Sequence, residues 1–141
     1  MNLSQNVKIT KVHAYEGAAG SDHYSDILDM AGWDGVVFLA SIGTAAANNG
    51  VNAEQDTDSA FGTDPQDLEG TKILSDATQT DFVLDIYRPT ERYVRLQIIR
   101  GTSTTIEAVW AIQYQGRYMP VENDTAAQAH EVHASPAEGT A

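Results

Sequence analysis

Two short groups of residues have the side-chain types of a chemical site. Ser21, Asp22 and His23 include the three types of a hydrolytic triad, but immediate neighbours in sequence cannot align as that mechanism requires. His130 and His133 have a spacing found in metal sites, yet the segment around them lacks the helical pattern and the third ligand of a zinc enzyme. We therefore expect no catalytic residue and no metal site from these groups.

Carboxylates are frequent in the polar segment 43–70, where they suggest cation binding. Asp56, Asp64 and Asp67 offer the oxygen ligands that Ca²⁺ prefers. An EF-hand loop that begins at Asp56 fails, because Phe61 stands where such a loop needs glycine. We expect a solvated loop, with an irregular Ca²⁺ site as the alternative. The sequence also lacks both glycine-rich phosphate-binding motifs, so we expect no nucleotide and no other cofactor.

The charge distribution argues against nucleic acid and membrane as partners. The chain of 141 residues carries a net charge of −12, and the interval between Lys11 and Lys72 holds 11 acidic residues and no basic one. Binding to the polyanionic backbone of nucleic acid needs clustered Lys and Arg. An anionic membrane surface repels an acidic protein for the same reason.

Length and composition favour one domain that folds without covalent cross-links. The sequence has no cysteine, which excludes disulfides and thiol chemistry. The first residues lack the pattern of a secretory signal, and the longest apolar stretch, Val36 to Ala47, is shorter than the about 20 residues of a membrane helix. We expect a soluble protein that is made in the cytoplasm.

Alternating apolar residues predict strands in the second half of the chain. Period two over residues 82–86, 94–98 and 106–114 places even-numbered side chains, Trp110 among them, in a common core. Short connections predict a three-stranded antiparallel meander. The favoured register sets Ile86 opposite Val94, and a neighbouring even register remains open.

The first half of the chain gives three further predictions. Residues 7–15 form an edge strand that carries lysines. Residues 35–42 are apolar on both faces, so they form either a central strand or a strand that a partner covers. Residues 43–70 form a polar loop with a turn at Asn49 and Gly50, with a further strand at 51–57 as an option. At the other end of the chain, residues 121–141, acidic and rich in alanine, form a mobile tail or an arm that becomes ordered only on a partner.

Five residues form a candidate protein interface: Trp33, Tyr87, Tyr93, Arg95 and Ile99. The last four point outward from the predicted meander, and aromatic residues and arginine are enriched at interfaces. Trp33 either packs against the domain or anchors an interface. The alternative for the whole group is an ordinary exposed sheet face.

Three segments carry a resemblance to a known family. They are Asp-Met-Ala-Gly-Trp-Asp-Gly-Val-Val-Phe at 29–38, Arg-Tyr-Val-Arg-Leu at 92–96 and Gly-Arg-Tyr-Met-Pro-Val at 116–121. Their order around the 43–70 loop is similar to that in capsid decoration (cement) proteins of tailed bacteriophages. The resemblance covers about residues 7–121, and the acidic tail has no counterpart in the family pattern.

The resemblance implies a fold, a place and partners. The fold is an all-β antiparallel sandwich of jelly-roll type over residues 1–120, and the place is the capsid exterior of a virion. The partners are the major capsid protein and further copies of the chain in a dimer or trimer. The family has no catalytic residues, so we expect no enzyme. The alternative is a carbohydrate- or receptor-binding β-sandwich of a phage tail or fibre, with Trp33 as a sugar platform.

Overall fold

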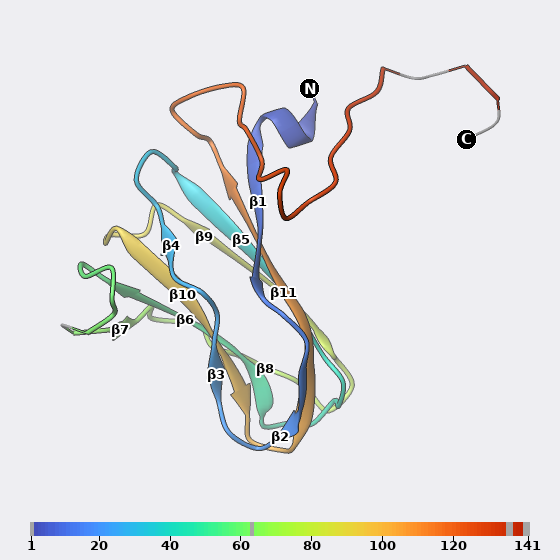
Figure 1. Cartoon of the computed structure of the whole chain (residues 1–141). Coiled ribbons are helices and arrows are strands. Elements are labelled where there is room, and N and C mark those ends of the chain that lie inside the picture. The colour runs from blue at the N-terminus through green and yellow to red at the C-terminus, as the bar shows by residue number, and fades with distance from the viewer. Residues whose placement is uncertain (1, 63, 135–136, 140–141) are drawn as a thin grey trace.

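Two antiparallel sheets packed face to face make up the fold in the computed structural model, which describes residues 2–62, 64–134 and 137–139 (Figure 1). A 3₁₀ turn, η1 (Leu3–Gln5), precedes the strands. The strands are β1 (Val7–His13), β2 (Glu16–Ala19), β3 (His23–Tyr24), β4 (Leu28–Asp29), β5 (Gly35–Ile42), β6 (Asn49–Asp56), β7 (Gln66–Asp67), β8 (Ile73–Leu74), β9 (Asp81–Tyr87), β10 (Tyr93–Arg100) and β11 (Thr104–Tyr114). The prediction of an antiparallel β-sandwich is confirmed.

The strand order is that of a jelly roll. Sheet A has the order β1-β11-β5-β9, and β2 also pairs with β11. Sheet B has the order β3-β10-β6-β7, with β4 paired to β10 and β8 paired to β6. The long strands β5, β6, β9, β10 and β11 alternate between the two sheets along the chain, which is how a jelly roll is wound.

The predicted three-stranded meander is wrong. β9 pairs with β5 and β10 pairs with β6, so Ile86 lies opposite Val36, and Val94 lies opposite Gln55. The even-numbered side chains of β9 and β10 nevertheless point inward, as predicted, because the inner faces of the two sheets meet in one core. Alternation reveals which side of a strand is buried and not which strand is its neighbour.

A β-bulge in β11 reverses the inward positions that were predicted for this strand. The register shifts between Ile106 and Ala108. Ile106 is buried, but beyond the shift Val109 and Ala111 face the core. A bulge adds one residue and so exchanges the two faces of the strand. Trp110 therefore lies partly exposed on the outer face of sheet A, and its predicted place in the core is wrong.

The predicted 43–70 loop contains a central strand of sheet B. β6 includes Asn49 and Gly50, which were predicted to form a turn, and all of its residues are buried. Its outer face is covered by the chain that follows, where Asn52 donates a hydrogen bond to Asp67 at 2.6 Å and Leu68 packs against the core. The optional strand at 51–57 thus exists but begins earlier. Polar side chains on β6 are covered by protein, which composition alone does not indicate.

Strands β1 and β5 take the predicted positions in sheet A. β1 lies at one edge, and β5 lies between β11 and β9. The core between the sheets is built from fully buried side chains such as Val36, Phe38, Leu96, Ile98 and Val109. Among the described residues, no helix has the length and apolar character to cross a membrane.

The first part of the predicted mobile arm lies along the free edge of β1. The backbone N–H of Ile9 donates to Oδ1 of Asn123 at 2.7 Å, and Nε2 of Gln128 donates to the carbonyl oxygen of Ile9 at 2.7 Å. Residues 121–128 are therefore attached to sheet A, contrary to the prediction for that segment. The rest of the arm includes residues 135–136 and 140–141, which lie outside the described residues.

Candidate functional site

The predicted interface residues do not share one surface. Tyr87 lies on β9 in sheet A, whereas Tyr93, Arg95 and Ile99 lie on β10 in sheet B. The outer faces of the two sheets point to opposite sides of the sandwich, so the common surface predicted from the meander is wrong. Trp33 lies in the loop before β5 and packs partly against the core.

Arg95 is held by residues of its own chain. Its Nη2 atom lies 2.7 Å from Oε2 of Glu54, and both side chains are largely buried. The guanidinium group also lies over the rings of Tyr24 and Phe61, 4.0 Å and 4.3 Å from their centroids. Stacking and pairing of this kind suit the planar guanidinium. Arg95, on β10, therefore holds the 57–62 loop and the neighbouring strand β3 against the outer face of sheet B.

Trp33 lines a surface hollow of about 550 Å³ together with Arg88, Arg92 and Arg117. Arg92 forms a two-pronged ion pair with Asp29, with Nε–Oδ1 and Nη2–Oδ2 distances of 2.9 Å and 2.7 Å. The hydrogen bond from Arg92 lowers the pKa of the Asp29 carboxyl to about 2. The hollow thus combines an aromatic ring with fixed polar groups.

A more extended surface is the outer side of sheet A, where apolar side chains stand next to each other. We name it the outer apolar face. Its members are Ile9, Val37, Leu39, Val83, Trp110 and Ile112. Leu39 lies opposite Trp110 on one side and Val83 on the other, and the three line a hollow of about 300 Å³. Outward side chains of an antiparallel sheet are usually polar, so this face is suited to contact with another surface.

Tyr114 flanks the outer apolar face at one end of β11. Its ring lies directly on Gly35, where a Cβ atom would clash with the ring. The Tyr114 hydroxyl donates a hydrogen bond of 2.7 Å to Oδ1 of Asp85. Burial, with a further contribution from this hydrogen bond, raises the pKa of Tyr114 to about 12. A polar margin of this kind limits the apolar surface on that side.

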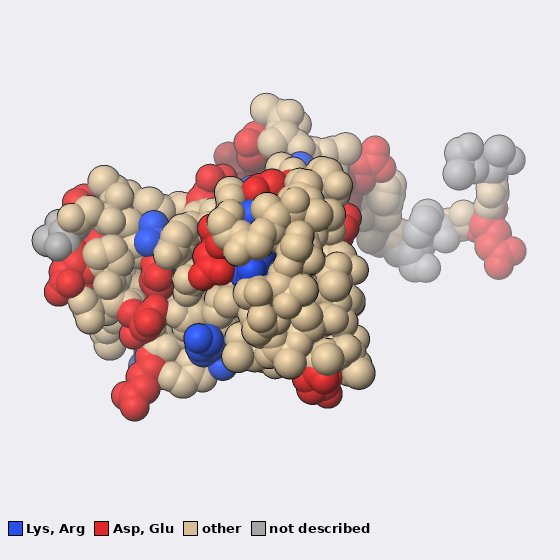
Figure 2. Space-filling model, turned by 90° about the horizontal axis from the view of Figure 1, so that it is seen from below, with Lys and Arg blue, Asp and Glu red and all other residues tan. Residues whose placement is uncertain are grey.

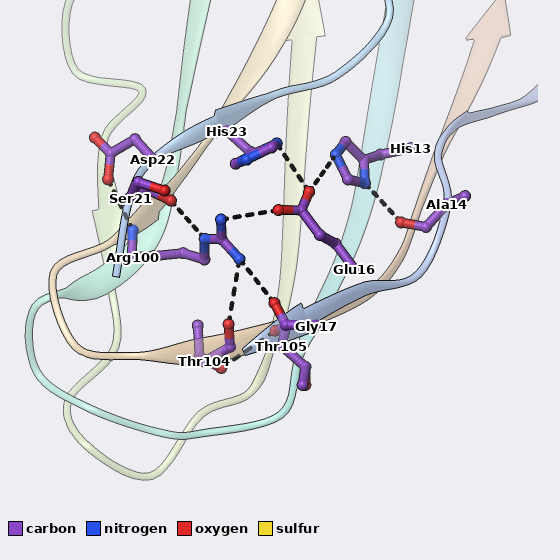
Figure 3. Close-up of polar contacts among 10 residues, drawn as sticks. All are labelled: His13, Ala14, Glu16, Gly17, Ser21, Asp22, His23, Arg100, Thr104 and Thr105. Carbon is purple, nitrogen blue, oxygen red and sulfur yellow. Dashed lines mark hydrogen bonds and ion pairs between the residues drawn. The ribbon is translucent and has the colours of Figure 1, made fainter. Parts of the chain in front are cut away.

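Arg100, at the other end of the sandwich, is fully buried and connects several backbone segments (Figure 3). Its guanidinium donates to the carbonyl oxygens of Ser21 and Gly17 and to Oε1 of Glu16, the last at 3.1 Å. Its backbone N–H donates to Oδ1 of Asp22 at 2.9 Å. These bonds fix the 16–22 segment onto the end of β10, because a buried guanidinium requires all its donors to be bonded.

The second carboxylate oxygen of Glu16 faces two histidines (Figure 3). Nδ1 of His23 lies 2.8 Å from Oε2 of Glu16, and Nε2 of His13 lies 3.5 Å from the same atom. The two imidazole rings are edge to face, with centroids 5.7 Å apart. His13 ends β1, Glu16 begins β2 and His23 lies in β3, so the cluster joins the edge of sheet A to the edge of sheet B.

Sequence reasoning missed this cluster. The spacings between His13, Glu16 and His23 match no metal motif, and the turn after β2 brings His23 back to the end of β1. Within the part of the chain that the structure describes, these three side chains form a group whose possible ligand atoms lie close enough together to bind one metal ion. His133, by contrast, pairs with Glu131 on the exposed tail at 2.8 Å.

The carboxylate of Asp56, proposed above as a possible Ca²⁺ ligand, organises its own loop. Oδ1 accepts a hydrogen bond from the backbone N–H of Asp58 at 2.9 Å, and Oδ2 accepts one from the N–H of Asp64 at 3.4 Å. Asp67 accepts the bond from Asn52 already described. The hydrogen bonds of these carboxylates therefore hold the acidic loop in place over β6.

The end of the sandwich that carries the 43–48 and 101–103 turns is poor in basic groups. Figure 2 views the molecule from this end and shows acidic side chains outnumbering basic ones around a broad uncharged area. The segments 43–48 and 101–106 contain no charged residue. Such a surface lacks the clustered positive charge on which binding to nucleic acid depends.

Comparison with known proteins adds little to this geometry. No protein family model matches the sequence, and no curated protein matches it. A solved structure of a family two carbohydrate esterase from Cellvibrio japonicus is similar, with 13% sequence identity and a TM-score of 0.34. The similarity covers 78% of this chain and 35% of that one, so the chain spans about a third of the esterase.

Proposed function

We propose that this chain is a capsid decoration protein of a tailed bacteriophage. It is a non-catalytic β-sandwich, made in the host cytoplasm, that binds the outside of the head and bridges neighbouring major capsid subunits. The observation that carries the proposal is the outer apolar face of sheet A. This face leaves Val83 64% exposed beside Leu39 and Trp110.

The energetics of this face favour binding to a repeating lattice. Apolar contact contributes about 25 cal/mol per Å² of buried surface, and association costs roughly 4–15 kcal/mol. A small contact by one subunit therefore binds weakly. A dimer or trimer that engages several lattice positions at once gains from the high effective concentration of its second contact. We accordingly propose that the chain acts as a symmetric dimer or trimer.

The charge of the chain supports a place outside the shell. A protein with a net charge of −12 is repelled by packaged DNA and competes poorly for it. The major capsid protein is the proposed partner, and neither nucleic acid nor membrane has a part in the interaction.

The test is co-sedimentation of the purified chain with DNA-free heads assembled from the cognate major capsid protein. Val83→Asp places a charge in the middle of the outer apolar face, and Val132→Asp is the matched control. Val132 is also an exposed valine, 39% accessible, but it lies on the C-terminal tail. We expect Val83→Asp to weaken head binding by about tenfold or more, while Val132→Asp binds like the native chain.

Two results would contradict the proposal. One is a native chain that stays in the supernatant with heads at every concentration tested. The other is equal head binding by the Val83→Asp and Val132→Asp proteins, both shown to be folded by circular dichroism. The second result would move the contact away from sheet A.

A second candidate function is recognition of a carbohydrate receptor by a tail or fibre module. It is favoured by the hollow that Trp33 shares with Arg88, Arg92 and Arg117. Sugar rings stack on tryptophan, and fixed charged groups bond to their hydroxyls. A glycan array tests this candidate. Specific glycan binding that Arg88→Ser weakens, in a chain that does not bind heads, would replace the first proposal.

A further inference from the structure

We propose that His13, Glu16 and His23 form a binding site for a divalent transition metal, and that Zn²⁺ is the ion that suits it best. Two imidazole nitrogens and one carboxylate oxygen are a known donor set for Zn²⁺, with the remaining position left to water. The bound ion would tie β1 and β2 of sheet A to β3 of sheet B. This inference is independent of the proposed function.

The spacing of the ligand atoms suits a small cation. A tetrahedral Zn²⁺ with bonds of about 2.0–2.1 Å holds its ligand atoms roughly 3.3 Å apart. Nε2 of His13 is already 3.5 Å from Oε2 of Glu16, and the three ligand atoms all lie within 4.8 Å of one another. Binding of the ion would bring the three atoms to the coordination distance by rotation of their side chains. The side chains of His13, Glu16 and His23 are 15%, 30% and 38% exposed, so an ion and a water ligand have access from solvent.

The tautomer of His13 directs an unshared electron pair into the cluster. Nδ1 of His13 lies 2.6 Å from the carbonyl oxygen of Ala14. A carbonyl oxygen only accepts, so Nδ1 carries the hydrogen and Nε2 of the neutral ring carries the lone pair. When the ring is neutral, that lone pair faces an acceptor oxygen of Glu16, and a bound metal cation, like a proton, removes the repulsion between them. A ring N–H bonded to a backbone carbonyl is also the usual way in which a metal-binding histidine is oriented.

Glu16 is held in place for this role by Arg100. Oε1 of Glu16 bonds to Nη2 of Arg100, a side chain that is fully buried and bonded on its other nitrogens as well. One carboxylate oxygen is therefore committed to the interior, and Oε2 is left for the two histidines. Because β1, β2 and β3 supply the ligands, only the folded chain assembles the site, so bound metal must stabilise the fold.

The test is titration of the full, chelator-treated chain with ZnCl₂ by calorimetry, together with thermal unfolding. We expect one ion per chain and a rise in the melting temperature of roughly 8 °C at a 100-fold excess over Kd. His13→Gln and His23→Gln should each weaken Zn²⁺ binding by about tenfold or more. The matched control is the double variant His130→Gln/His133→Gln, which removes the two histidines of the tail and should bind Zn²⁺ like the native chain.

A separate readout locates the ion and guards against misfolded variants. Zn²⁺ should shift the imidazole resonances of His13 and His23 in the native chain and leave those of His130 and His133 in place. The proposal is overturned if the native chain shows no saturable Zn²⁺ binding, or if binding survives both His13→Gln and His23→Gln. It is equally overturned if binding disappears in the His130→Gln/His133→Gln protein, since the tail would then hold the ion.

Discussion

Replacing Arg100 with methionine removes the guanidinium from the buried network at the end of β10 and keeps much of the side-chain volume. The carbonyl oxygens of Gly17, Ser21 and Thr104 and the carboxylate of Glu16 each lose a donor. The segment 16–22 is held on the sandwich by these bonds, so we expect the loss to appear as lower global stability.

The size of the effect follows from the burial of the partners. Removing one member of a buried ion pair costs about 3–5 kcal/mol. Glu16 is 30% exposed and keeps its contacts to His13 and His23, which places the expected loss near the lower limit, about 3 kcal/mol. Against a typical total stability of about 5–15 kcal/mol, such a loss lowers the melting temperature by roughly 10 °C.

The matched comparison is Arg92→Met. Arg92 also forms an ion pair with a carboxylate, that of Asp29, but the two side chains are 57% and 46% exposed. Solvent screens this pair, so its removal should cost much less stability than the removal of Arg100, although the pKa of Asp29 is strongly lowered. Urea unfolding followed by tryptophan fluorescence measures the free energy of unfolding of both variants. An Arg100→Met protein that loses less than about 1 kcal/mol, or an Arg92→Met protein that loses as much as Arg100→Met, would refute the argument from burial.

Three further predictions concern sheet A. Gly35→Ala should destabilise the fold by about 1–3 kcal/mol in thermal unfolding, because the new Cβ meets the Tyr114 ring, and adding Tyr114→Ala should restore part of the loss. An uncorrected Gly35→Ala protein with native stability would contradict that contact. The raised pKa of Tyr114 means that its stabilising effect is complete below pH 10.0 and is lost as the pH rises toward about 12. Phenolate absorbance should show a late-titrating tyrosine in the native chain, and its persistence in Tyr114→Phe would assign it to another residue. Asn123→Ala should cost about 1–2 kcal/mol in urea unfolding, since the Ile9 N–H loses its acceptor, and an unchanged midpoint would show that water replaces the side chain at no cost.

The buried faces of β9 and β10 could be predicted from the sequence because the pleat of a strand fixes them locally. Phe82 and Leu96 are buried as their alternation indicates. The pairing partners could not be predicted in the same way, because an inward-facing pattern looks the same in either sheet. A hairpin between β9 and β10 is the simplest reading of a short connection, but here that connection crosses from one sheet to the other.

Two other errors have local physical causes. The bulge near Ala108 moves Trp110 from the core to the outer face of sheet A, and no residue type in that stretch signals it. In β6, Asn49 and Gly50 have the composition of a turn, yet Asn49 bonds to the neighbouring loops and is fully buried. Composition indicates how costly such residues are to bury on average. It does not show whether the fold supplies hydrogen-bond partners for their polar groups.

The candidate sites were harder to predict than the fold, because their members come from separate elements. Trp110 joins Leu39 and Val83 only through strand pairing, and Glu16 meets Arg100 only where β2 crosses the end of β10. The buried state of Arg100 has no signal in the sequence, where arginine indicates a solvated position. The sequence alone does not show which distant segments lie next to each other in the fold.

The tail that follows β11 also decides how copies of this chain can meet. A bare edge strand offers its amides and carbonyls to any extended segment that comes near, which is the route to ribbon-like aggregates. At Ile9 both groups are already occupied, by Asn123 and Gln128 of the same molecule. Two molecules could join into one continuous sheet through β1 only after residues 121–128 detach from that strand. Edge-to-edge association through β1 is therefore disfavoured.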